Sequence, residues 1–169
     1  RTPSNFSSIA WNVIGDKEMG VIAGGMDDGA VTLWDPHAII SSKSDRVGHG
    51  CVSVQNIHDG YCVNAIEFNP QKPTLLASGG KEVYIQDLSK SLQAPTVFTP
   101  GEPNYHEGNI VTSISWNRVG PYILASASND GTVVIWDLKN SKAIFNFKDP
   151  DLQTYDFNPL TSQNDEFQM

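Results

Sequence analysis

Residues 122–138 read YILASASNDGTVVIWDL, and this stretch decides the fold. Its first seven residues alternate apolar and small polar side chains, the period of a strand with one buried face. The following Asn-Asp-Gly carries the turn chemistry of a tight hairpin, and the β-branched run TVVIW closes on Trp136. The stretch is therefore predicted to form a β-hairpin that ends in Trp136-Asp137.

Two earlier copies of this pattern occur in the chain. The repeated segments are FSSIAWN (6–12), VNAIEFN (63–69) and VTSISWN (111–117), then VIAGG (21–25), LLASG (75–79) and ILASA (123–127), then VTLWD (31–35), VYIQD (83–87) and VVIWD (133–137). The closing Asp returns about every fifty residues, a spacing typical of blade-type repeats with long loops. Weaker strand patterns at 51–57, 95–99 and 143–148 supply a fourth strand to each unit. The predicted units span about 6–57, 62–99 and 110–148, and 152–158 is predicted to be the first strand of the next unit.

Composition limits the class of protein. The 169 residues are 39% hydrophobic and 18% charged, which suits one globular core. A net charge of -8 with 11 scattered Lys and Arg residues argues against nucleic-acid binding, which depends on clustered cations. The longest apolar runs are strand-sized, so no membrane insertion is expected. Cys51 and Cys62 are too few for a disulfide scaffold and favour a reduced, intracellular chain.

The repeat signals resemble those of the WD-repeat β-propeller family over nearly the whole chain. This resemblance implies an all-β fold, here about three blades plus one strand of a seven-bladed ring. It also implies a structural polar tetrad in the third unit, formed by His106, Ser126 (or Ser128), Asp130 and Trp136. Such a chain of indole, hydroxyl, imidazole and carboxylate satisfies its own hydrogen bonds while it joins loop to sheet. Its expected role is stability.

The resemblance implies only partial tetrads in the other two units. Unit two keeps His58 and Ser78, but Gln86 replaces the Trp and Lys81-Glu82 replaces the turn that contains Asp. Unit one has Asp28 and Trp34, and its entering loop at residues 1–5 contains no His. Only the third unit is therefore expected to form the complete tetrad.

The details between the repeats are similar to the amino-terminal propeller of the larger outer-cage subunit of COPII vesicle coats. The similar runs are GVIAGGMDDGAVTLWDPHAIIS, NPQKPTLLASGG, TPGEP and ISWNRVGPYILASAS. This resemblance implies a protein-interaction scaffold at cage vertices, in the cytoplasm and at the periphery of the endoplasmic reticulum membrane. The implied partners are other coat subunits, including a smaller propeller subunit whose pairing segment lies outside this chain. The alternative is a propeller that recognises a peptide or substrate in a ubiquitin-ligase or chromatin complex.

A closed propeller has about four to eight blades, and closure covers the flanks of its blades. Three blades and a fraction leave two apolar flanks open. The chain is therefore expected to be a piece of a longer protein, and the alternative is that another chain completes its ring.

Three chemical hypotheses, a zinc site, a phosphate loop and a pair of catalytic carboxylates, are less well supported by the sequence than purely structural explanations of the same residues. His49, Cys51, His58 and Cys62 have the spacing H-x-C-x6-H-x3-C, which does not match paired zinc ligands. The run at 78–81, SGGK, lacks the glycine spacing and following helix of a phosphate loop. The repeated Asp residues are explained as turn residues that cap backbone N–H groups, and no nucleophile motif is present. The sequence predicts no enzyme activity, no cofactor and no metal.

Overall fold

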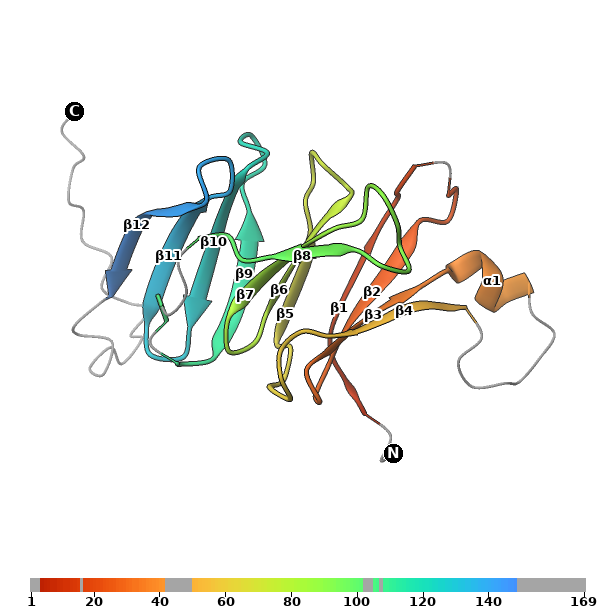
Figure 1. Cartoon of the computed structure of the whole chain (residues 1–169), viewed down its shortest axis with the longest axis horizontal. Coiled ribbons are helices and arrows are strands. Elements are labelled where there is room, and N and C mark those ends of the chain that lie inside the picture. Colours follow the sequence, from red (N-terminus) through yellow and green to blue (C-terminus); the bar gives the residue numbers. More distant parts are fainter. Residues whose placement is uncertain (1–3, 16, 42–49, 102–104, 107, 149–169) are drawn as a thin grey trace, which may run out of the picture.

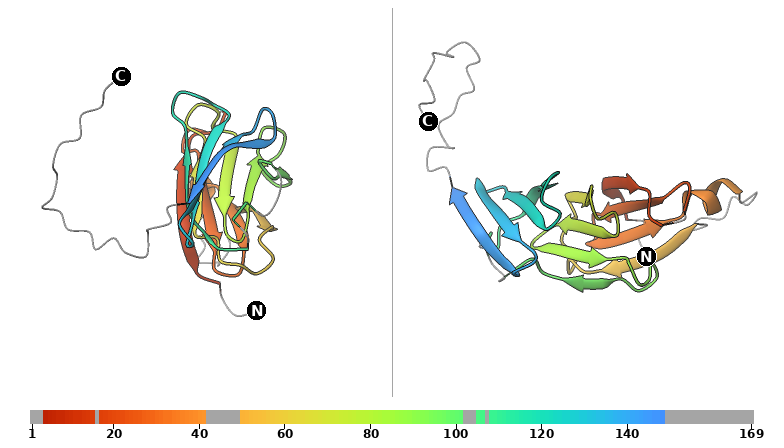
Figure 2. Two further views of the ribbon diagram at one scale, coloured as in Figure 1. Left: turned by 90° about the vertical axis from the view of Figure 1, so that its left-hand side faces the viewer. Right: turned by 90° about the horizontal axis from the view of Figure 1, so that it is seen from above.

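A computed structural model describes residues 4–15, 17–41, 50–101, 105–106 and 108–148. The described chain is almost entirely β-structure, in three four-stranded antiparallel sheets that lie side by side (Figure 1). Seen from above, the three sheets follow one another along a curved row (Figure 2). No helix among the described residues is long and apolar enough to cross a membrane.

Each sheet is a meander in which consecutive strands pair. Sheet one contains β1 (Phe6–Asn12), β2 (Val21–Met26), β3 (Ala30–Trp34) and β4 (Cys51–Asn56). Sheet two contains β5 (Ala65–Phe68), β6 (Leu75–Gly79), β7 (Val83–Asp87) and β8 (Thr96–Phe98). Sheet three contains β9 (Val111–Trp116), β10 (Ile123–Ser128), β11 (Thr132–Asp137) and β12 (Lys142–Lys148). The predicted all-β repeat fold is confirmed, whereas the segment 152–158 lies outside the described residues.

The hairpin predicted first is β10–β11, with Leu124 opposite Trp136. Its turn reverses at Gly131, whose φ of 82° lies in the left-handed region that glycine adopts without steric cost. Gly29 has a φ of 86° at the equivalent turn of sheet one. The Asn-Asp-Gly and Asp-Asp-Gly sequences are thus used for the same backbone reversal.

Two apolar cores lie between neighbouring sheets. The core between sheets one and two includes Val21, Leu33, Val63 and Leu76. The core between sheets two and three includes Ile85, Val111, Leu124, Val134 and Trp136. Each sheet therefore packs face to face on the next, and strands β1, β5 and β9 lie nearest to one another along the row.

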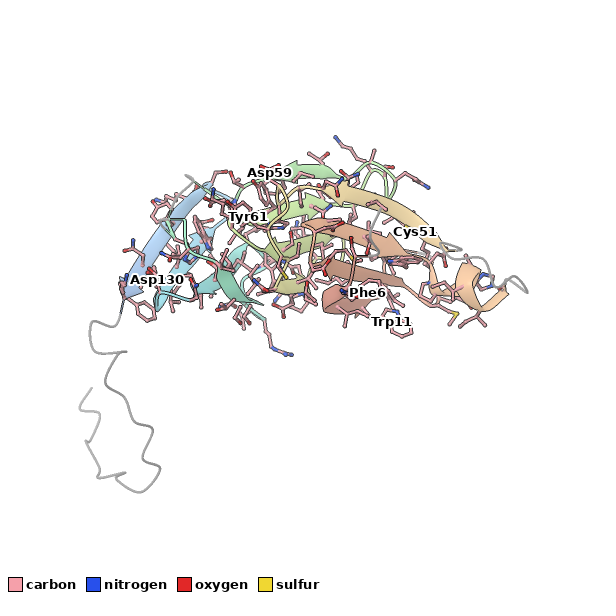
Figure 3. All side chains as sticks on the ribbon, turned by 90° about the horizontal axis from the view of Figure 1, so that it is seen from below. Phe6, Trp11, Cys51, Asp59, Tyr61 and Asp130 are labelled. Carbon is pink, nitrogen blue, oxygen red and sulfur yellow. The ribbon has the colours of Figure 1, made fainter. Side chains whose placement is uncertain are left out.

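The outer faces of the first and third sheets are apolar and exposed. On sheet one, Phe6, Ile9 and Trp11 are each more than half exposed, and Trp11 reaches 60%. Figure 3 shows Phe6 and Trp11 on the same side of the molecule. On sheet three, Phe145 and Phe147 lie opposite Ile135 and Val133 and are also exposed.

A short helix, α1 (Pro36–Ser41), follows sheet one's third strand and was not predicted. Its start carries ordinary helix signals. Asp35 accepts hydrogen bonds from the backbone N–H groups of His37 (3.0 Å) and Ala38 (3.3 Å), and Pro36 occupies the first helical position. The Asp that closes the repeat therefore also caps a helix in this unit.

Candidate functional site

Three of the four residues predicted as the tetrad of the third unit meet in one hydrogen-bonded chain. His106, in the loop before β9, lies with Nε2 at 2.8 Å from the Ser126 hydroxyl on β10. The Trp136 indole on β11 donates to the same hydroxyl over 2.8 Å. All three side chains are buried, and Tyr105 packs edge-on against the Trp136 ring. Ser126 thus links the entering loop to the central strands.

Asp130, the fourth predicted member, bonds within its own hairpin. Its carboxylate accepts a hydrogen bond from Ser128, bonds from the Thr132 N–H (3.0 Å) and hydroxyl (2.9 Å), and an ion pair with Lys148 at 2.9 Å. The hydrogen bond from Ser128 makes the largest contribution to holding the pKa of Asp130 well below its ordinary value, and the bonds from Lys148 and Thr132 lower this pKa further. The carboxylate therefore fixes the β10–β11 turn, and the alternative serine of the prediction belongs to this group.

The imidazole of His106 makes its hydrogen bond through Nε2. Among the described residues, Nδ1 of His106 has no hydrogen-bond partner. Burial lowers the pKa of His106, and the nearby Asp130 charge opposes that shift. The ring is consequently neutral in the folded chain near pH 7.

In unit two the predicted pair is present and the Trp is replaced. His58 Nε2 lies 2.9 Å from the Ser78 hydroxyl, and Tyr84 packs edge-on to the imidazole with a centroid separation of 4.9 Å. Gln86 occupies the Trp position at 0% exposure. Both polar atoms of its amide lack a hydrogen-bond partner among the described residues. Unit two thus keeps the histidine–serine pair of the tetrad and buries the amide of Gln86 where unit three has an indole.

Gln86→Met is expected to raise the free energy of unfolding by about 1–2 kcal/mol, because an unpaired buried amide carries its full desolvation cost. Methionine has a similar length and volume, so little repacking is required. Urea unfolding followed by circular dichroism measures the change. Gln86→Glu is the matched control and should destabilise the chain, since it puts a carboxylate in the same space. A neutral or destabilising Gln86→Met would show that the amide is satisfied in solution.

Unit one departs furthest from the predicted pattern. Gly24 stands where the other units have Ser78 and Ser126, and the Phe6 ring fills the space beside it, 2.3 Å from where a Cβ would lie. The Trp34 indole donates instead to the Thr32 hydroxyl over 3.0 Å. Asp28 bonds to the Ser4 hydroxyl and to the Ala30 N–H. Within the described residues, the indole and the carboxylate of unit one thus make separate contacts, to Thr32 and to Ser4 and Ala30, in place of the serine–histidine link of unit three.

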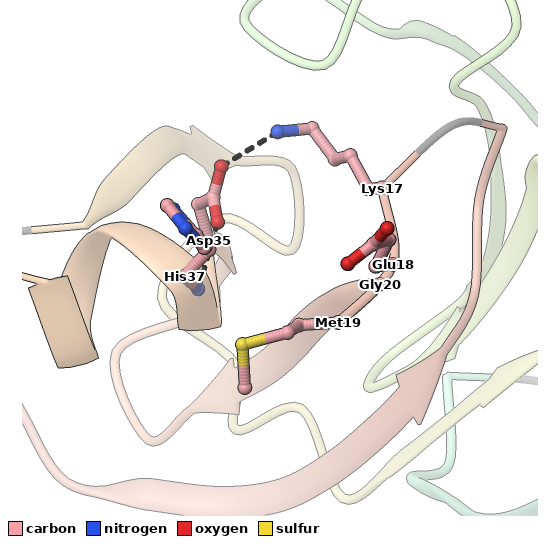
Figure 4. Close-up of a pocket in the computed structure, with 6 residues that line it drawn as sticks. All are labelled: Lys17, Glu18, Met19, Gly20, Asp35 and His37. Carbon is pink, nitrogen blue, oxygen red and sulfur yellow. Dashed lines mark hydrogen bonds and ion pairs between the residues drawn. The ribbon is translucent and has the colours of Figure 1, made fainter.

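A polar cavity of about 320 Å³ lies beside α1 (Figure 4). Lys17 crosses the cavity and pairs with Asp35 at 2.6 Å. This bond is the main reason that the pKa of Asp35 lies below its ordinary value. The other lining residues are Glu18, Met19, Gly20 and His37. The Lys17 cation and the Asp35 carboxylate that caps α1 pair with each other, and Glu18 adds a second carboxylate to the lining.

The remaining sequence candidates are separated by the fold. Cys51 lies on β4 and Cys62 in the connection to β5, and no group of three potential metal ligands occurs among the described residues. His49 lies outside the described residues. The SGGK run leaves the end of β6 for a tight connection to β7, without a helix. The polar groups brought together by the fold are suited to holding loops on sheets.

Sequence reasoning missed the contacts between neighbouring loops. Asn69 donates its amide to the Pro121 carbonyl (2.8 Å), and Glu67 accepts the Trp116 backbone N–H at 2.8 Å. The available signal was the Asn that ends each first-strand segment in the repeat. No local pattern reveals which distant carbonyl such a side chain reaches.

Comparisons with known proteins agree with this architecture. The WD40 model, described as WD domain, G-beta repeat, matches residues 101–137. Protein transport protein SEC31 of Dictyostelium discoideum is 38% identical over 154 residues, covering 86% of this chain and 11% of that protein. Protein transport protein Sec31B of Mus musculus is 35% identical over 146 residues, covering 83% of this chain and 12% of that protein. The chain thus spans about a tenth of the length of these relatives.

Among solved structures, a chain of "COPII on membranes, outer coat vertex" is similar with a TM-score of 0.67 and 26% identity, over 89% of this chain and 38% of that chain. A chain of the Mitotic Checkpoint Complex is similar with a TM-score of 0.59 at 18% identity, over 85% of this chain and 39% of that chain, which speaks for the fold alone. The described chain therefore has the fold of a partial β-propeller, with a WD repeat at residues 101–137, and it resembles the Sec31 transport proteins and a COPII outer coat chain in sequence and in fold.

Proposed function

We propose that this chain is part of a propeller that serves as a protein-interaction scaffold in a COPII-type outer coat. The observation that carries the proposal is the 38% identity to a Sec31 transport protein over 86% of the chain. The similar solved chain comes from an outer coat vertex. In this role the propeller contributes rigid surfaces at cage vertices, in the cytoplasm at the endoplasmic reticulum membrane, and carries out no chemistry of its own.

The exposed outer faces support the proposal that further blades complete the ring. Within the chain, each sheet buries its face against the next, and the same kind of apolar face is left open at both ends of the row. Exposed apolar faces of this size favour association with a matching surface. On this proposal the units at about 6–57, 62–99 and 110–148 are consecutive blades of one closed disc.

The test uses the full-length protein that contains this chain. Purified with the smaller propeller subunit of the outer coat, it should co-elute with that subunit and form closed cages visible by electron microscopy. The Trp136→Ala variant should still co-elute, because the resemblance places the pairing segment after the propeller, and should form far fewer cages. Failure of the unaltered protein to co-elute would contradict the coat role, and recovery with a ubiquitin-ligase or chromatin complex would favour the alternative.

A further inference from the structure

The charged side chains divide unequally between the two loop ends of the sheets. The upper end in Figure 1 is formed by the β1–β2, β5–β6, β7–β8, β9–β10 and β11–β12 connections. The lower end is formed by the β2–β3, β4–β5, β6–β7 and β10–β11 connections. The upper end holds the described cations Lys17, Lys72, Lys90, Arg118, Lys139 and Lys142. The lower end holds Asp27, Asp28, Asp59, Glu82 and Asp130, with Lys81 and Lys148. An acidic chain thus presents one relatively basic end.

Most described carboxylates at the upper end accept hydrogen bonds or form an ion pair with nearby groups of the chain. Asp35 pairs with Lys17 and caps α1. Asp87 accepts the Ser89 backbone N–H at 2.9 Å. Asp137 accepts the Lys139 N–H at 2.9 Å and the Asn140 amide at 2.6 Å. Glu18, at the cavity beside α1, and Glu67, which accepts the Trp116 backbone N–H, are further described carboxylates there. These carboxylates keep their charges, and around sheets two and three the described cations Lys72, Lys90, Arg118, Lys139 and Lys142 outnumber Glu67, Asp87 and Asp137.

Two upper loops, at 69–74 and 117–122, are bound together into one rigid surface. Gln71 donates its amide to the Val119 carbonyl at 2.8 Å. Lys72 donates to the Tyr122 hydroxyl and lies 4.4 Å from the centroid of the Tyr122 ring. The side chain of Asn117 accepts the N–H groups of the next turn at 2.8 and 2.7 Å. These bonds order the turn before any partner arrives.

We define the upper platform as Gln71, Lys72, Arg118, Val119 and Tyr122. Val119 is 85% exposed at its tip, the largest exposure among the exposed large hydrophobic side chains described. Arg118 beside it is exposed and has no ion pair within the described part of the chain. A rigid turn that holds an apolar and a cationic side chain out of the surface resembles the anchor pairs of binding interfaces.

A cavity of about 300 Å³ adjoins the upper platform between sheets two and three. Lys72 and Tyr122 belong to both. Leu75, Phe98 and Leu138 supply the apolar wall, and Thr74, Asp87 and Ser89 supply the polar wall. The space suits one aromatic or branched apolar side chain. Because the loops are already ordered, a partner loses less conformational free energy on binding than it would on a mobile surface.

We propose that the upper platform binds an acidic, extended peptide segment that places one apolar side chain in this cavity. The carboxylates of the segment face Arg118 and Lys72, and its apolar groups cover Val119. Charge complementarity selects an acidic partner and speeds the encounter. The inference does not depend on the coat role, because it rests on the geometry of these two loops.

The test measures fluorescence anisotropy of a labelled short peptide that alternates Asp with Leu and Phe, added to the full chain. Binding should weaken about tenfold or more in Arg118→Glu and in a peptide with Asn for Asp, and salt should weaken it as expected for exposed charges. Val119→Ser should also weaken it. Lys81→Glu makes the same charge change at the lower end and should alter binding less than about twofold.

Thermal unfolding of each variant shows whether the fold is retained, and Arg118→Glu should melt like the unaltered chain because its side chain is exposed. Two results would overturn the proposal: no peptide binding at about millimolar concentrations, the weak limit of a useful interaction, or equal losses in Arg118→Glu and Lys81→Glu. Binding to vesicles rich in phosphatidylserine, without binding to the peptide, would assign the platform to a membrane surface instead.

Discussion

Trp136→Ala is expected to lower the free energy of unfolding by about 3–5 kcal/mol, the usual cost of deleting a large buried aromatic side chain. Trp136 is 3% exposed and lies in the core between sheets two and three. Its ring contacts Tyr105 at a centroid separation of 5.1 Å, and its indole N–H donates to Ser126. The substitution therefore leaves a cavity and removes one hydrogen bond from a buried chain.

Urea unfolding followed by circular dichroism measures this loss without relying on tryptophan fluorescence. Trp136→Phe separates the two contributions, because it keeps most of the volume and loses only the N–H bond, at about 1 kcal/mol. Trp34→Ala is the matched control, since Trp34 is only half-buried and lies on the outer face of sheet one. Equal losses for Trp34→Ala and Trp136→Ala would contradict the argument that burial between sheets decides the effect.

The strands could be predicted because their signals are local. The alternation in 122–128, the glycine at 131 and the β-branched run after it all favour the hairpin that forms, with Leu124 opposite Trp136. The His106–Ser126–Trp136 contact followed from a family resemblance, since its partners are 20 and 10 residues apart and no periodicity joins them. Period and turn chemistry thus predict strands, and resemblance predicts which side chains meet.

Asp130 shows that a family resemblance does not predict every contact of the residues it identifies. The resemblance placed this carboxylate in the same chain as His106, whereas Ser128, Thr132 and Lys148 surround it with donors. Donors within two residues, or across one strand pair, compete directly for carboxylate oxygens. Deciding between them requires the positions of all the donors, which a sequence does not contain.

The contacts of unit one and of the upper platform could not be predicted from the sequence for a similar reason. Phe6 fills the space over Gly24 because a glycine leaves room for a ring, and neither residue indicates the other in sequence. Gln71 and Val119 are 48 residues apart, yet their loops are neighbours because successive sheets stack in register. Repeat architecture therefore makes distant loops adjacent, while the identity of each contact depends on side chains that the repeat does not fix.

The stability of the chain is expected to fall as the pH drops from 7 to 5, by about 2 kcal/mol through His58 alone at 1.36 kcal/mol per pKa unit. Burial lowers the pKa of His58 from 6.5 to about 4. Between these two values the unfolded chain holds a proton that the folded chain excludes. The free energy of unfolding therefore decreases as pH falls below 6.5, and this decrease ends near 4. Burial lowers the pKa of His106 as well, so its contribution has the same sign.

Urea unfolding at pH 7, 6 and 5 measures the slope, and His58→Gln should make it shallower whatever its effect at pH 7. His37→Gln is the control: His37 lies exposed on α1, so its profile should follow that of the unaltered chain. If His58→Gln fails to fold, the imidazole C–H resonances of the unaltered chain give the same answer by titration. A His58 resonance that titrates near 6.5, or a slope unchanged by His58→Gln, would show that the imidazole beside Ser78 accepts a proton in the folded state.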